Sequence, residues 1–296
     1  MYTAITQNKV KTVVLMIGFV VFIVAFGWIL SLAFNRPGLL VFLSVFAIVY
    51  AIFSYYSGAR MALALSGAQP IVKADAPELY RVVENLSITA GLPTPDIYII
   101  DDPAPNAFAT GRDPNHAHVA VTRGLLAMMN ETELEGVIAH EMSHVGNYDI
   151  RLMAVVLALV TVVSLISHWF LRMSFFGDSD SGGDNNGALM IVGLIAAVVA
   201  PLVAMMLQLA VSRKREFLAD ATGALLTRYP EGLASALEKI ATYTKPMEHA
   251  STATAHLFIS SPLGNRGIGG AIASLFSTHP PIDERVARLH KMEQAV

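Results

Sequence analysis

Four long hydrophobic runs, separated by polar segments, dominate the pattern of the chain. A helix needs about 20 consecutive, mostly apolar residues to cross the hydrocarbon core of a bilayer. Runs of this length and character cover residues 12–34, 38–56, 152–171 and 188–210. The pattern predicts four transmembrane helices and divides the chain into a membrane hairpin, a polar block, a second hairpin and a second polar block, over residues 1–57, 58–151, 152–211 and 212–296.

Positively charged residues near the runs favour one orientation in the membrane. If the N-terminus is cytoplasmic, the inner flanks carry seven lysines and arginines and the outer flanks carry two. The inner residues are Lys9, Lys11, Arg60, Arg151, Arg213, Lys214 and Arg215, and the outer ones are Arg36 and Arg172. Because cytoplasmic flanks carry an excess of Lys and Arg, we expect both termini and both polar blocks to lie in the cytoplasm.

The polar blocks have the periodicities of a small α+β domain. Helical spacing appears in "APELYRVVENLSITAG" and in "NETELEGVIAHEMSH", where Asn130 or Thr132 can cap the helix. The stretches "DIYII", "NAFATG" and "HAHVAVTRGLL" predict three strands. In the second block, two helices flank "YPEG", and a last helix covers "IDERVARLHKM". The expected fold is a mainly α membrane protein of four transmembrane helices plus a cytoplasmic α+β domain with a small β-sheet.

Composition supports the membrane assignment and narrows the chemistry. Hydrophobic residues make up 54% of the chain and charged residues only 15%, against about 25% charged in a soluble domain. The net charge of −3 and the lack of a basic stripe argue against a nucleic-acid partner. The chain has no cysteine, which excludes disulfides, thiolate metal sites and cysteine nucleophiles, so any metal must be held by His, Asp or Glu.

The segment "HEMSH" matches the pattern H-E-x-x-H. His140 and His144 are four residues apart, so on a helix they project from one face and can share one Zn²⁺. Glu141 lies beside them, where it can take a proton from a water on the metal. The alternative is an ordinary polar helix face that happens to carry two histidines.

A catalytic zinc usually takes three protein ligands, so a third ligand is expected elsewhere. Glu216 and Asp220 in "SRKREFLAD" are also four residues apart, so one could bind the metal while the other supports a ligating histidine. The alternative is an exposed helix whose acids pair with its own arginines. The predicted hairpin 152–211 favours the metal site, because it returns this segment to the face from which "HEMSH" departs.

The chain resembles the HtpX-like integral-membrane zinc metalloproteases, relatives of the CaaX prenyl proteases. The resemblance rests on the four hydrophobic runs and on four segments in this order: "NAFATG", "HEMSH", "REFLAD" and "STHPPIDERVARL". The resemblance covers nearly the whole chain. It implies a zincin-like catalytic domain in which His140, His144 and Glu216 bind one Zn²⁺ and Glu141 is the general base. It also implies that Asp220 orients a ligand histidine and that Arg285 supports the carboxylates.

Substrate contacts are implied by the same resemblance. His279 would stabilise the oxyanion of the reaction. An exposed edge strand would pair with the substrate backbone rather than read its side chains; this strand consists of Asn106, Ala107, Phe108 and Ala109. Such recognition suits an enzyme that cuts many unfolded sequences.

The expected function is that of a zinc-dependent endopeptidase of the bacterial inner (plasma) membrane, which acts in stress response and protein quality control. Its partners would be the lipid bilayer and misfolded or damaged membrane proteins. One alternative is an intramembrane protease, although "HEMSH" precedes its hydrophobic run and residues 188–210 contain no aspartate. The other is a catalytically silent zinc-binding scaffold, which would not need Glu141.

Overall fold

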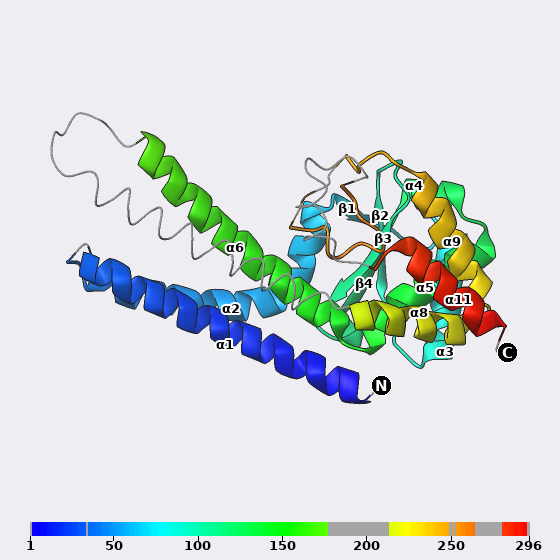
Figure 1. Ribbon diagram of the computed structural model, residues 1–296, viewed down its shortest axis with the longest axis horizontal. Helices are drawn as coiled ribbons and strands as arrows, with labels where there is room; N and C mark the ends of the chain where they lie inside the picture. Colours follow the sequence, from blue (N-terminus) through cyan, green and yellow to red (C-terminus); the bar gives the residue numbers. More distant parts are fainter. Residues whose placement is uncertain are drawn as a thin grey trace.

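A computed structural model describes residues 2–33, 35–176, 213–248, 251, 253–263 and 280–294 of the chain. The predicted fourth span, residues 188–210, and His279 lie outside these residues. Three long helices extend from one side of a rounded body that contains the sheet (Figure 1). They are α1 (Tyr2–Ala33), α2 (Gly38–Leu65) and α6 (Asp149–Phe176).

Among the described residues, α1 and α2 are long and apolar enough to cross a membrane. A third crossing is counted only if α6 and the preceding helix α5 (Glu131–Gly146), which meet at an 80° bend, form one broken span. The faces of α1 and α2 that look outward carry large exposed apolar side chains, among them Val21, Trp28, Leu32, Val41 and Phe42. A protein surface of this kind is suited to lipid rather than to water.

The inner faces of these three helices pack on one another. Phe19 and Ile23 of α1, Ala47 of α2, and Leu152 and Val156 of α6 belong to one buried apolar cluster. Tyr50 of α2 adds a cross-helix hydrogen bond by donating its hydroxyl to the Ala158 carbonyl, at 2.9 Å. The three helices therefore form a packed unit as well as presenting apolar surface.

The described residues contain a mixed four-stranded sheet of order β1-β2-β4-β3. Its strands are β1 (Ala68–Pro70), β2 (Asp96–Ile100), β3 (Ala107–Gly111) and β4 (Ala117–Thr122). β2 and β4 are parallel, and the other two pairings are antiparallel. The sequence predicted β2, β3 and β4 but missed β1. It also extended the last strand too far, because residues 123–128 form helix α4 (Arg123–Met128), which is capped by the Thr122 hydroxyl.

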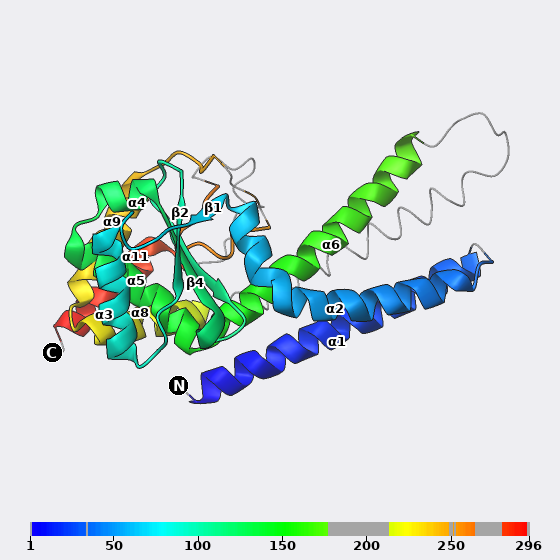
Figure 2. The ribbon, with the colours of Figure 1, turned by 180° about the vertical axis from the view of Figure 1, so that it is seen from behind.

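Helices from both polar blocks pack together beside the sheet and share one core with it (Figures 1 and 2). They are α3 (Pro77–Ala90) and α5 from the first block, and α8 (Arg213–Thr227), α9 (Pro230–Thr242) and α11 (Ile282–Glu293) from the second. Val83, Val121, Ile138, Leu237 and Leu289 all lie in this core. The two blocks therefore fold together, although residues 152–211, with two hydrophobic runs, separate them in the sequence.

The ends of α5 are set by local chemistry. At its start, the Asn130 side chain accepts from the Glu133 backbone, and the Glu133 side chain accepts from the Asn130 backbone. This reciprocal capping box makes Asn130, and not Thr132, the N-cap residue of α5. At its other end, Tyr148 has a φ of 61°, a left-handed conformation that interrupts the helix before α6 begins. α5 therefore packs on the sheet, and α6 leads away at an angle of 80° to α5.

Candidate metal centre

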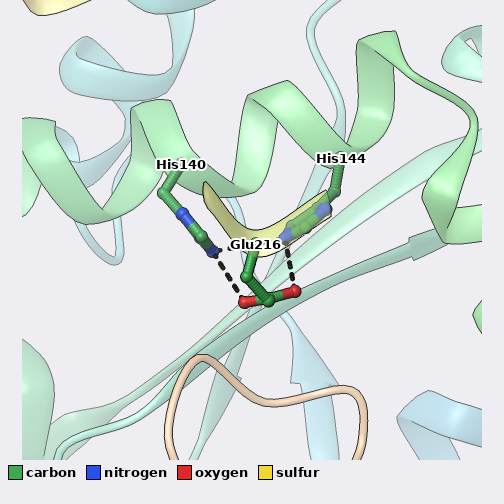
Figure 3. Close-up of side chains that lie close together, drawn as sticks. All are labelled: His140, His144 and Glu216. Carbon is green, nitrogen blue, oxygen red and sulfur yellow. Dashed lines mark hydrogen bonds and ion pairs between the residues drawn. The ribbon is translucent and has the colours of Figure 1, made fainter. Parts of the chain in front are cut away.

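Three side chains from two helices converge in the rounded body (Figure 3). His140 and His144 come from α5 and Glu216 comes from α8, and all three are buried. The two Nε2 atoms lie 3.2 Å apart. One Glu216 oxygen lies 3.8 Å from the His140 Nε2 atom, and the other lies 3.7 Å from the His144 Nε2 atom. Ligand atoms around a tetrahedral zinc, each about 2.0–2.2 Å from the ion, lie about 3.3–3.6 Å from one another, so these residues fit a shared metal ion.

Glycine allows α8 to reach the metal centre. A Cβ atom on Gly223 would lie 2.9 Å from the His140 backbone nitrogen and 3.2 Å from the Ala139 carbonyl carbon. The α8 backbone thus packs directly on α5 at the first histidine of the motif. This contact brings Glu216, two turns earlier on α8, opposite the two imidazoles.

Both imidazoles are held from behind by carboxylates. The Nδ1 atom of His140 lies 2.9 Å from Asp220, and the Nδ1 atom of His144 lies 3.1 Å from Asp149. A histidine that donates Nδ1–H to a carboxylate keeps its Nε2 lone pair for a metal. The sequence predicted the position of Asp220 but missed Asp149. A signal was present, because Asp149 is the one acidic residue between "HEMSH" and the third hydrophobic run.

Arg285, which the family resemblance implies supports the carboxylates, contacts Asp220. Its guanidinium donates from Nε to one Asp220 oxygen at 2.9 Å and from Nη2 to the other at 2.7 Å. Nη1 donates to the Ile259 carbonyl at 3.1 Å, and the whole side chain is buried. Burial works against a charge on Asp220, but Arg285 and the hydrogen bond to His140 bring the pKa of Asp220 down to about 2. This carboxylate is therefore ionised at neutral pH.

Burial and charged neighbours shift the pKa values of the residues at the centre. Burial lowers the pKa of His140 to about 4 and raises that of Glu141 to about 7. Burial also opposes a charge on His144, but its hydrogen bond to Asp149 and the nearby Glu216 outweigh burial and raise its pKa to about 9. The surroundings thus stabilise a positive charge at His144 and disfavour one at His140.

Glu141 lies beside the ligands and contacts the sheet. It is buried on α5, and its carboxylate accepts a hydrogen bond from the Ala109 backbone N–H of β3. One element thus supplies two metal-binding candidates and an acid–base candidate, and the sheet fixes the position of that acid. His279 lies outside the described residues, so its predicted role stays a prediction.

For the strand expected at Asn106, Ala107, Phe108 and Ala109, the structure agrees with an edge position but not with exposure. β3 is an edge strand, but these residues are buried. Residues 253–263 run along part of the edge: the Ile259 N–H donates to the Ala107 carbonyl at 2.9 Å, and the Asn106 amide donates to the Ser260 carbonyl at 3.0 Å. Pairing of this strand with substrate remains a prediction.

Comparison with known proteins agrees with this geometry. The family described as "Peptidase family M48" matches residues 73–293. A "Protease HtpX homolog" of Tropheryma whipplei (strain Twist) is 49% identical over 292 residues, which cover 99% of this chain and 98% of the relative. The chain belongs to peptidase family M48. A second "Protease HtpX homolog", from Dictyoglomus turgidum, is 46% identical over 294 residues, which cover 98% of this chain and 94% of the relative.

A solved structure has a similar architecture. The crystal structure of S. mikatae Ste24p superimposes with a TM-score of 0.52 at 20% identity, and the match covers 98% of this chain and 67% of that one. At this identity the likeness speaks for the fold alone. Family membership, the apolar helices and the His140–His144–Glu216 cluster together identify a membrane metalloprotease.

Proposed function

We propose that this M48 protein is a zinc-dependent endopeptidase in which His140, His144 and Glu216 hold one Zn²⁺ and Glu141 is the general base. The observation that carries the proposal is the convergence of two imidazole Nε2 atoms and one carboxylate next to Glu141. Two histidines and one glutamate are a known ligand set of catalytic zinc. The absence of cysteine from the chain leaves nitrogen and oxygen donors, and zinc accepts both.

The chemistry follows from the positions of the side chains. Bound zinc would acidify a water molecule and polarise the scissile carbonyl. The Glu141 carboxylate would take a proton from the attacking water and deliver it to the leaving nitrogen. Asp220 and Asp149 would keep the ligand imidazoles in the tautomer with Nδ1–H. His279 would donate a hydrogen bond to the developing oxyanion.

A cytoplasm-facing site in the bacterial inner membrane is part of the proposal, with four spans in all. Two observations support it. The positive charges flank the same ends of the hydrophobic runs. The N-terminal end of α1 lies beside the rounded body (Figure 2), where Asn8 donates to Asp149. A centre next to the membrane boundary suits substrates that are themselves misfolded or damaged membrane proteins. The burial of α5 against the sheet favours this over an intramembrane protease.

The test is cleavage of an unfolded protein by the full chain, purified in detergent and loaded with Zn²⁺. Wild type is compared with Glu141→Gln, which keeps the shape of the side chain but cannot take a proton. We expect the wild type to cut, chelation to stop it, and the variant to lose about 10²–10⁴-fold in rate while it retains one zinc per chain. If both proteins hold zinc and both cut equally, Glu141 is not the base. If both hold zinc and neither cuts, the silent scaffold is the better account.

A further inference from the structure

Asn8 is a polar residue on the first membrane helix, yet its side chain is buried against the metal centre. It is only 2% exposed. Its Nδ2 atom donates to an Asp149 oxygen at 2.6 Å and to the Asn147 carbonyl at 2.9 Å. Both ribbon views show the N-terminal end of α1 beside the rounded body (Figures 1 and 2). A buried amide is costly unless it is hydrogen-bonded, and here the bonds go to the support of a metal ligand.

The two oxygens of Asp149 have different partners. Oδ2 faces the Nδ1 atom of His144 at 3.1 Å, and Oδ1 accepts from Asn8. The carboxylate is planar and rigid, so holding one oxygen fixes the direction of the other. The hydrogen bond of Asn8 therefore helps to set the orientation of the His144 ring, in the way that outer partners orient ligands at metal sites.

The oxygen of the same amide contacts the other half of the centre. Asn8 Oδ1 accepts from Arg215 Nη1 at 3.3 Å, and Arg215 directly precedes the third ligand candidate, Glu216. Arg215 Nη1 also lies 3.5 Å from Asp149. The Asn8 side chain of α1 thus contacts both the α5–α6 turn and α8, which belong to different polar blocks.

The next residue of α1 holds the same turn. The Lys9 ammonium lies 4.3 Å from the centre of the Tyr148 ring, and the Arg151 guanidinium lies 4.9 Å from the centre of the same ring. The φ of 61° at Tyr148 is unfavourable for a bulky residue and persists only where surrounding contacts hold it. α1 therefore contacts the turn through two consecutive residues, immediately before Asp149.

We infer that Asn8 is a positioning residue of the metal centre: it holds the Asp149 carboxylate that orients His144, and so makes metal affinity depend on the seating of α1. The inference rests on the proposed metal centre. It means that displacement of the N-terminal end of α1 weakens metal binding, and that bound metal in turn stabilises α1 in its place. Such reciprocity is required of any two linked equilibria.

The experiment measures the affinity of the full-length, detergent-purified protein for Zn²⁺ by competition with a chromophoric chelator. The variants are Asn8→Leu, Asp149→Asn and the two combined. Thr12→Val is the matched control, because Thr12 is equally buried on α1 and donates only to the Asn8 carbonyl, at 2.8 Å. The visible spectrum of the Co²⁺-substituted proteins reports ligand geometry independently of activity.

We expect Asn8→Leu to weaken Zn²⁺ binding about tenfold, the lower end of the effect of an outer partner, and to alter the Co²⁺ spectrum. The double variant should bind no more weakly than Asp149→Asn alone, because Asn8 acts through Asp149. Thr12→Val should bind as the wild type does. Should Asn8→Leu not fold, Asn8→Ser, whose shorter side chain also loses the amide donor, takes its place.

Two results would overturn the inference alone: wild-type affinity in Asn8→Leu, or single losses that add in full in the double variant. A wild-type protein that binds no Zn²⁺ would instead refute the proposed metal centre, and the inference with it. The two failures are therefore distinguishable in one set of titrations.

Discussion

The two histidines of the candidate metal centre are supported in different ways. Behind His140, Asp220 accepts two hydrogen bonds from Nε and Nη2 of the fully buried Arg285 guanidinium, and all of these groups belong to the rounded body. Behind His144, Asp149 lies at the start of α6 and is held by the amide of Asn8 from α1. One half of the centre is completed by the rounded body, and the other by residues of the long helices α1 and α6. The comparison suggests that the membrane helices help to build the site as well as anchoring it.

The largest difference in stability is expected between variants of Arg285, which contacts Asp220, and of Arg215, which contacts Asp149. Arg285→Met leaves Asp220 buried without its charge partner, which costs about 3–5 kcal/mol in comparable buried pairs. Arg215→Met should cost clearly less, because Arg215 lies 3.5 Å from Asp149, which keeps its hydrogen bond from Asn8. Thermal unfolding of the metal-free proteins in one detergent measures both. Equal destabilisation would show that the two halves are supported alike.

The two carboxylates offer a finer comparison. Asp220→Asn and Asp149→Asn both keep an acceptor for Nδ1–H but remove a charge, and we expect each to lower Zn²⁺ affinity about 10–100-fold. The loss should be greater for Asp220→Asn, because Arg285 then remains buried without a counter-charge. Chelator competition measures both constants. A larger loss at Asp149 would reverse the order and make the membrane side the stronger support.

The contact between α5 and α8 gives a further comparison, between a glycine at a close backbone contact and one in open space. A methyl group at Gly223 meets backbone atoms that cannot swing away, at 2.9–3.2 Å, so Gly223→Ala should cost about 1–3 kcal/mol in stability and move Glu216 away from the imidazoles. Gly18→Ala on α1 is the control, because nothing lies within 4 Å of its added Cβ. Unfolding midpoints and Zn²⁺ affinity are measured together. If both variants behave as the wild type does, the close approach does not position the third ligand.

Local signals predicted much of the fold. Helix ends are marked by residues that lie next to them in the sequence. α3 has a proline at its start and Gly91, at a φ of 65°, after its end, and α5 begins with the Asn130–Glu133 capping box. β1 was not predicted because it is only three residues long and is defined by its pairing with β2. The end of β4 was misplaced because the Thr122 hydroxyl caps a short helix there.

The site shows the same division between local and distant information. The motif "HEMSH" and the helical spacing of Glu216 and Asp220 are regular patterns, so they could be read from the chain. Asp149 follows a left-handed residue, and no helical spacing relates it to His144. The burial of β3 and the contact of Asn8 depend on segments more than 130 residues away, which no local pattern encodes.

The central claim is that two imidazoles and a carboxylate, which residues 152–211 separate in the sequence, hold one zinc ion. Zinc K-edge X-ray absorption of the purified full chain, wild type beside Glu216→Ala, tests it most directly. The account predicts one zinc per chain in the wild type, with two imidazoles among nitrogen and oxygen ligands at about 2.0–2.2 Å, and a weakened, altered site in the variant. An unchanged spectrum at full occupancy in Glu216→Ala, or a zinc without imidazole ligands, would contradict it.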